Sequence, residues 1–127
     1  MKLHQIEPGK LNLFTGYGTG YVSVNNVRHA TSVVVSPLAV AEWRVGNFAD
    51  LTLADFGFVA ELKAEIVILG TGAVQRFPRP ELARALAAAG TGVEIMDSKA
   101  ACRTYNILAA EGRKVVAAIL LEPTPAT

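Results

Sequence analysis

The stretch that decides the fold is Glu65-Ile66-Val67-Ile68-Leu69-Gly70-Thr71-Gly72. Its large apolar residues run without interruption from Ile66 to Leu69 and end at a glycine. A short run of this kind is typical of a strand buried on both faces of a parallel sheet. Parallel strands need long, usually helical crossovers, so the stretch predicts an α/β layer in the second half of the chain.

Helix and strand signals alternate after this stretch. Pro80 suits the first turn of a helix and Gly90 suits its end, while Asp97 or Ser98 suits the N-cap of a second helix that Gly112 closes. The last apolar run is continuous, which favours the centre of the sheet. The predicted elements are a strand over 65–69, a helix over 80–89, a strand over 93–96, a helix over 98–110 and a strand over 114–121.

The first half of the chain has the pattern of β structure. The pair Asn25-Asn26 tolerates positive φ and suits a two-residue hairpin turn, and Pro37 ends a strand. A short helix is expected over 53–62, although Gly57 weakens it. These segments either extend the sheet of the second half or fold a second sheet over it. The predicted strands are 21–24, 27–28, 31–36 and 39–45, the last of which carries Trp43.

The composition excludes several classes of protein. The 127 residues are 51% hydrophobic and 18% charged, with a formal net charge of +1. This balance excludes a disordered chain and opposes sequence-independent nucleic-acid binding, which needs many Lys and Arg. The length suits one domain, so we expect a single domain over 1–127 with loose ends at 1–10 and 122–127.

The compartment expected from the sequence is the cytoplasm. Cys102 is the only cysteine, so it can make neither an internal disulfide nor a multi-cysteine zinc site. Residues 1–12 lack the apolar core of a signal peptide, and the longest apolar run, 115–121, is too short to span a bilayer. We expect no cofactor, no metal and no membrane contact.

Gly70-Thr71-Gly72 follows a predicted strand, at the sheet edge where ligands collect in α/β proteins. A dinucleotide fingerprint needs a third glycine and an immediate helix, but Gln75 holds the third position and no helix is expected before Pro80. The glycines either present backbone N–H groups to an anion or form a tight turn. The tight turn is the more common use of such residues.

Charged side chains follow this loop. Arg76, Arg79 and Arg84 suit an acidic ligand or partner, or they are ordinary solvated surface charge. Glu94 interrupts the strand over 93–96. Alternation explains Glu94 if one face of that strand is wet, and the sharper alternative is a carboxylate that lines a pocket.

The densest set of reactive side chains lies in the helix predicted over 98–110. A thiol near a helix start can have its pKa lowered by the helix dipole and by Arg103, which makes Cys102 a candidate nucleophile and Asp97 a candidate acid or base. The ordinary alternatives are a small buried cysteine and an N-cap aspartate. The usual base is missing, because His4 and His29 are both in the other half of the chain. The expected core face is Ala101, Thr104, Tyr105 and Leu108, with Cys102 and Asn106 on its shoulder.

The motif Ala100-Ala101-Cys102-Arg103-Thr104-Tyr105-Asn106 resembles that of one known family. Segments 68–72, 92–98 and 111–113 and the upstream hairpin are also similar, so the resemblance covers nearly the whole chain. The family consists of small domains of unassigned chemistry and includes a mitochondrial respiratory complex I assembly factor and an adipogenesis-associated mammalian protein. The resemblance implies a three-layer α/β fold with a central mixed sheet, flanking helices and an additional N-terminal β-layer. It implies assembly or regulation through protein contacts and supplies no reaction.

Three hypotheses follow for the function. The favoured one is a non-enzymatic protein-binding or assembly-factor-like module that uses an apolar patch or a groove beside the loop 70–77. The alternative is an enzyme or small-anion-binding protein with a pocket between residues 70–72 and the start of the helix over 98–110. The polar set of that pocket would be Glu94, Asp97, Cys102, Arg103 and Asn106. The third is a homo-oligomer that pairs through the strand over 93–96. The candidate ligand- or partner-binding residues are Gly70, Thr71, Gly72, Arg76, Phe77, Glu94, Arg103 and Asn106.

Overall fold

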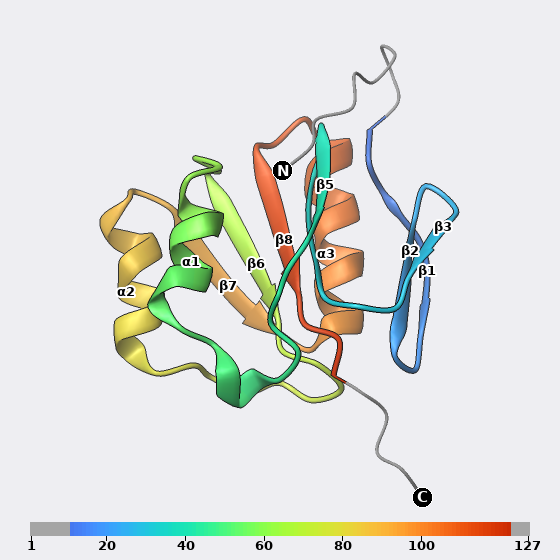
Figure 1. The fold of residues 1–127 in the computed structure, drawn as a ribbon. Coiled ribbons are helices and arrows are strands. Elements are labelled where there is room, and N and C mark those ends of the chain that lie inside the picture. Colours follow the sequence, from blue (N-terminus) through green and yellow to red (C-terminus); the bar gives the residue numbers. More distant parts are fainter. Residues whose placement is uncertain (1–10, 123–127) are drawn as a thin grey trace, which may run out of the picture.

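Two β-sheets lie on opposite sides of one helix, α3 (Ser98–Ala110), in the computed structural model, which describes residues 11–122 (Figure 1). Two further helices, α1 (Leu53–Ala60) and α2 (Pro80–Ala88), cover the face of the larger sheet that points away from α3. The strands are β1 (Phe14–Gly18), β2 (Tyr21–Val24), β3 (Val27–His29), β4 (Val33–Ser36), β5 (Ala39–Glu42), β6 (Ile66–Gly70), β7 (Gly92–Met96) and β8 (Val115–Ile119), and a 3-10 turn, η1, spans Phe48–Asp50. The predicted α/β class with an added N-terminal β-layer is confirmed.

The larger sheet is mixed and has the order β5-β4-β8-β6-β7. Strand β6 pairs in parallel with both β7 and β8, whereas β4 is antiparallel to β5 and β8. The continuously apolar β8 is therefore central, as its sequence predicted. Strand β7 is an edge of the sheet, which is the position assumed by the oligomer hypothesis.

Alternate residues of the central strands fill two separate cores. Val67 and Leu69 of β6 point towards α1 and α2, while Ile68 points towards α3. Both faces are covered, so a strand with no polar positions is stable here. This two-sided burial is the physical reason that the run from Ile66 contains no polar residue.

The smaller sheet has the order β1-β2-β3 and packs on α3 through Phe14, Val22 and Val24. Asn25 and Asn26 have φ of 48° and 69°, which confirms the predicted two-residue hairpin turn. Strand β1 was not predicted, because its sequence, Phe-Thr-Gly-Tyr-Gly, has two glycines and little alternation.

Several predicted boundaries were too long. The strand predicted over 31–36 begins at Val33, and the strand predicted over 39–45 ends at Glu42. Trp43 is buried beyond the end of that strand. Its ring meets the Phe56 ring edge-on, with the two ring centroids 6.4 Å apart. Helix α1 ends at Ala60.

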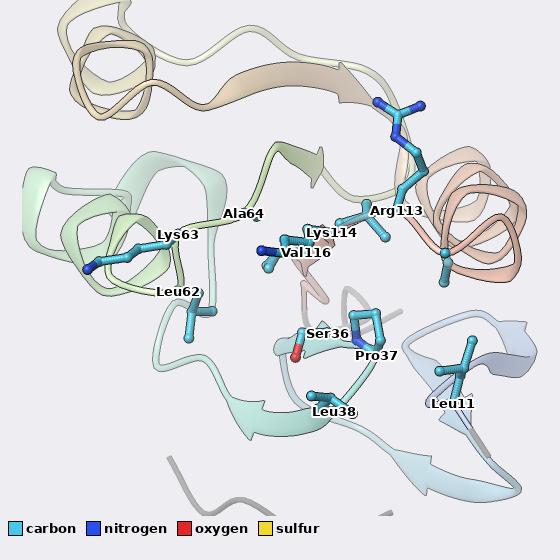
Figure 2. A pocket seen from close by; sticks show the side chains of 13 residues that line it. Leu11, Ser36, Pro37, Leu38, Leu62, Lys63, Ala64, Arg113, Lys114 and Val116 are labelled. Carbon is cyan, nitrogen blue, oxygen red and sulfur yellow. The ribbon is translucent and has the colours of Figure 1, made fainter. Parts of the chain in front are cut away.

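A separate cavity lies at each end of the parallel strands β6 and β8. At the carboxyl ends of β6 and β8, a cavity of about 370 Å³ lies beside the start of α3. At their amino ends, a cavity of about 450 Å³ lies between the ends of α1 and α3 and the β4–β5 turn (Figure 2). The predicted site belongs to the first of these ends.

Candidate functional site

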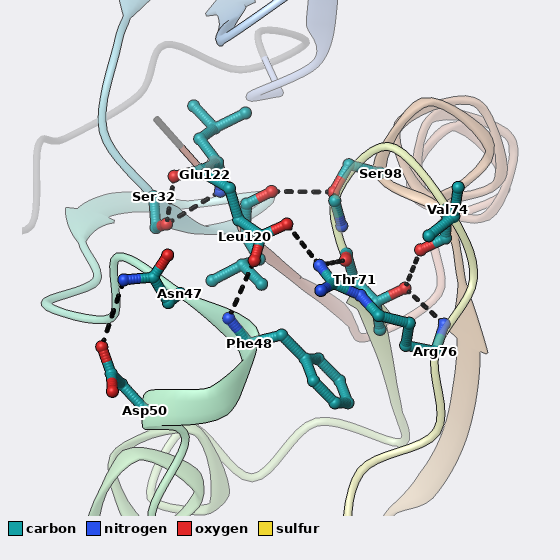
Figure 3. Close-up of polar contacts among 12 residues, drawn as sticks. Ser32, Asn47, Phe48, Asp50, Thr71, Val74, Arg76, Ser98, Leu120 and Glu122 are labelled. Atoms are coloured by element: carbon teal, nitrogen blue, oxygen red, sulfur yellow. Dashed lines mark hydrogen bonds and ion pairs between the residues drawn. The ribbon is translucent and has the colours of Figure 1, made fainter. Parts of the chain in front are cut away.

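The loop from Thr71 to Arg79, which joins β6 to α2, is held in one conformation by its own polar groups. The Thr71 hydroxyl donates to the carbonyl of Val74 at 2.7 Å and accepts from the backbone N–H of Arg76 at 3.0 Å (Figure 3). The Gln75 amide donates to the carbonyl of Ile95 in β7 at 2.8 Å. These bonds fix the loop against the edge of the sheet.

Arg76 connects the same loop to the end of β8. Its guanidinium donates to the carbonyl of Thr71 at 2.7 Å and forms an ion pair with Glu122, whose other carboxylate oxygen accepts from the N–H of Phe48 at 3.1 Å (Figure 3). The guanidinium also lies over the Phe48 ring, 4.7 Å from its centroid. Arg76 is therefore a bridging residue of the fold. Glu122, predicted to begin a loose tail, is bound on two sides, and residues 123–127 lie outside the described part of the chain.

The fixed loop directs two large apolar side chains to solvent. Val74 is 60% exposed and Phe77 is 71% exposed. Exposed apolar side chains are common singly, but these two lie within four residues of each other on a loop whose residues 71–76 are hydrogen-bonded. Phe77 was a predicted binding residue. Val74 was missed, because nothing in its sequence context separates an exposed valine from a buried one.

The segment Gly70-Thr71-Gly72 forms a tight turn whose N–H groups are already used. The N–H of Thr71 donates to the carbonyl of Met96 and that of Gly72 to the hydroxyl of Ser98, each at 2.9 Å. Gly72 has a φ of +99°, a conformation that strongly favours glycine. The tight-turn alternative fits this geometry, because neither N–H is left for an anion.

The cavity beside this turn lies where the enzyme alternative placed its pocket. Its wall contains Gly72, Ser98, Lys99 and Glu122 together with the β1–β2 turn. The polar set proposed for that pocket is absent from the wall. That set was Glu94, Asp97, Cys102, Arg103 and Asn106.

Cys102 is fully buried in the core that surrounds α3, in the core face of the helix and not on its shoulder. Burial raises the pKa of its thiol from 9.0 to about 12, although Arg103 acts in the opposite direction. A nucleophilic cysteine needs an accessible thiolate. The structure therefore contradicts the prediction that Cys102 is a nucleophile. It fits the ordinary alternative, in which Cys102 is a small buried residue of α3.

Labelling of Cys102 should be slow in the folded protein. A rise of about three pKa units lowers the thiolate fraction at neutral pH about a thousandfold, and burial blocks the reagent as well. A thiol-reactive dye in native buffer and in denaturant measures this difference in labelling rate. Native labelling at the rate of free cysteine would contradict the buried placement.

The buried thiol also makes the stability of the protein depend on pH. Stability should decline above about pH 9, because the unfolded thiol ionises there while the folded thiol keeps its proton until about pH 12.

The other polar residues of the motif also have structural partners. Asp97 is the N-cap of α3 and accepts from the N–H of Ala100 at 2.9 Å. Asn106 accepts from the N–H of Phe14 at 2.9 Å and donates to its carbonyl at 2.8 Å, and the Tyr105 hydroxyl donates to the carbonyl of Asn12 at 2.8 Å. The motif therefore attaches the N-terminal sheet to α3.

The remaining predicted site residues are spread over the surface. Arg103 is exposed and donates to the Tyr17 hydroxyl at 3.2 Å. Glu94 is exposed on the edge strand β7, as expected for a strand with one wet face. On the surface, the Nε of Arg79 lies 3.8 Å from a carboxylate oxygen of Glu81. Arg103 and Glu94 belong neither to the loop nor to the wall of the cavity beside it.

The edge available for strand pairing on β7 is short. Gly92 donates its N–H to Glu65 and therefore faces β6, so by alternation the backbone groups of Val93 and Ile95 face outward. The Gln75 amide occupies the carbonyl of Ile95. Two residues with one carbonyl already bonded give little support to the oligomer hypothesis.

Residues 11–122 contain neither a candidate metal-ligating cluster nor a candidate membrane-spanning helix. No group of three His, Cys, Asp or Glu side chains lies close enough together to hold a metal ion. Within the same residues, no helix combines the length and the apolar character needed to cross a membrane.

The architecture defines a class: small α/β proteins in which a three-stranded layer is fixed to one face of a mixed sheet through α3. A crystal structure of a Bordetella parapertussis protein shares it, with a TM-score of 0.86 and 45% sequence identity over 91% of this chain and 100% of that one. The chain belongs to the DUF498 family, described as "Protein of unknown function (DUF498/DUF598)", whose model matches residues 14–120.

Two relatives show what members of this group are called. NADH dehydrogenase (ubiquinone) 1 alpha subcomplex assembly factor 3 of Bos taurus is 36% identical over 106 residues, 82% of this chain and 57% of that protein. The chain thus spans little more than half the length of that curated relative. The 13 kDa major membrane protein of Francisella tularensis is 28% identical over 84% of this chain and 89% of its own length.

Proposed function

We propose that the chain is a non-enzymatic protein-binding module of the assembly-factor type, and that the loop from Thr71 to Arg79 contacts its partner. The observation that carries the proposal is the exposure of Val74 and Phe77 on a loop that Thr71 and Arg76 hold in place. The relatives named as assembly factors support the class of function. The proposal assigns no reaction to the chain.

The physical case rests on pre-organisation. Binding energy at protein interfaces is concentrated in a few residues, and aromatic anchors such as Phe77 are enriched among them. Burying such a side chain contributes about 1.5–3 kcal/mol. A loop that is already fixed loses little conformational entropy on binding, so more of this energy is available for affinity.

The charges near the loop indicate the chemistry of the partner. Arg79 is 66% exposed, and Arg84 is exposed on α2. An interface commonly has an apolar centre and a polar rim. The partner we propose has a small apolar pocket for Phe77, flanked by acidic residues that meet these two arginines.

The kind of partner follows from the relatives by analogy. We propose a subunit or assembly intermediate of a multisubunit complex such as NADH dehydrogenase, contacted in the cytoplasm. One relative is named a membrane protein, so cell fractionation is the direct check on the compartment. Recovery of the chain in the cytoplasmic fraction supports this placement, and recovery only with membranes contradicts it.

A double variant tests the contact. Val74→Ser with Phe77→Ser should reduce assembled NADH dehydrogenase, measured on native gels of membranes from cells whose own copy is deleted and replaced by the variant. We expect a reduction of at least tenfold at limiting expression, because the loss of two buried apolar side chains weakens binding by that factor or more. Both side chains face solvent, so the fold should remain intact.

The matched control is Ile107→Ser, which removes a side chain of similar exposure, 60%, from α3. It should leave assembly at the level of the unchanged chain. Equal assembly with the double variant and with the control would exclude the loop as the contact surface.

A further inference from the structure

The larger cavity lies at the opposite end of the sheet from the loop and takes no part in the proposed protein contact. Its volume of about 450 Å³ falls within the range of sites for small molecules, about 300–1,000 Å³. The wall combines apolar side chains with cations and contains no acidic residue (Figure 2). A site of this composition suits a ligand that is apolar at one end and anionic at the other.

The apolar part of the wall contains a side chain that the turn does not require. Ser36 pairs with Ala39, so Pro37 and Leu38 are the two turn residues between β4 and β5. Such turns favour glycine, asparagine and aspartate, yet this one holds a leucine that is 61% exposed. Leu38 borders the cavity together with Leu62, which follows α1, and a ligand that covers Leu38 would account for its exposure.

The cationic part of the wall comes from two chain segments that follow helices. Lys63 follows α1, and Arg113 and Lys114 follow α3. In Figure 2, Lys63 and Arg113 point away from the middle of the lining residues, whereas Lys114 extends towards it. Arg113 lies 3.6 Å from Glu65 and is partly neutralised. Cations at helix carboxyl ends also offset the helix dipole, but that role does not require an apolar wall beside them.

We propose that this cavity binds a small amphipathic carboxylate, of which a medium-chain fatty acid is the simplest example. The hydrocarbon chain lies against Leu38 and Leu62, and the carboxylate pairs with the ammonium of Lys114. The inference is independent of the protein-binding proposal, because it uses different residues at the other end of the sheet.

A homologous series tests the apolar half of the site. Hexanoate, octanoate and decanoate, each kept below its micelle concentration, are titrated into the full chain and followed by calorimetry and by backbone amide shifts. Each added methylene should tighten binding about fourfold, the factor that corresponds to about 0.8 kcal/mol. The shifted amides should be those of residues 62–64 and 113–116. Leu38→Ser should weaken the binding of every acid in the series.

Octanol and two lysine variants test the charged half. Octanol should bind at least tenfold more weakly than octanoate. Lys114→Gln should weaken octanoate to the level of octanol and leave octanol unchanged. Lys99→Gln, at the other end of the sheet, is the control and should have no effect. The proposal is overturned by the absence of saturable binding at millimolar octanoate, by equal binding of octanol, by equal effects of the two lysine variants, or by shifts confined to other residues.

Discussion

Gly70→Val should lower the free energy of unfolding by about 4 kcal/mol. A Cβ on Gly70 would lie 3.0 Å from the Cα of Ser98 and 3.1 Å from the Cβ of Ala101, both on the first turn of α3. These atoms cannot move without lifting α3 from the sheet. The valine would also displace the Ser98 hydroxyl, which accepts from the N–H of Gly72 and donates to the carbonyl of Leu120, each at 2.9 Å.

Chemical denaturation measures this effect, and Gly57→Ala is its matched control. A Cβ on Gly57 would meet nothing within 4 Å, and the residue lies inside α1. Alanine there should stabilise the protein by up to about 1 kcal/mol, since it removes the entropic cost of glycine in a helix. Similar unfolding midpoints for the two variants would mean that α3 does not pack on β6 as described.

Asn106→Ala should lower the free energy of unfolding by about 3 kcal/mol. Two hydrogen bonds to the backbone of Phe14 are lost, and the N–H and carbonyl of Phe14 are left without a side-chain partner. The Asn106 side chain fixes β1 to α3. We therefore expect β1 to detach from α3 before the rest of the protein unfolds. The amide of Phe14 should exchange with deuterium much faster than the amides of β6.

Ile107→Ala is the control for this variant, since Ile107 lies on the same helix and is 60% exposed. It should leave the unfolding midpoint and the exchange of Phe14 nearly unchanged. If the Asn106 and Ile107 variants behave alike, Asn106 does not attach the N-terminal sheet to α3.

The sequence predicted the second half of the fold well, for a local reason. Strand β6 is a continuous apolar run, α2 begins at Pro80 and α3 begins after its N-cap Asp97, so each signal lies within the element that it defines. The contact between β1 and α3 could not be predicted in this way. It joins Phe14 to Asn106, 92 residues apart, and no periodicity within either segment indicates the other.

The contrast between local signals and contacts across long sequence distances also explains which parts of the candidate site were predicted. Phe77 is exposed in the loop that the sequence analysis expects to be functional, and the function of that loop stays a prediction. Residue type alone makes Cys102 and Asp97 candidate catalytic groups and Asn106 a candidate binding residue. In the fold, Asp97 and Asn106 bond to backbone groups and Cys102 packs among core side chains. The link from Arg76 to Glu122 spans 46 residues and exists only because β8 ends beside β6.

The most direct measurement of the protein-binding proposal is site-specific photo-crosslinking in living cells. A benzophenone amino acid is placed at position 77 in one version of the chain and at position 107 in another, where Ile107 has comparable exposure. The account predicts one dominant crosslinked protein from position 77, its loss when Val74→Ser is added, and none from position 107. Equal crosslinking from both positions, or no crosslinked protein from position 77, would contradict it.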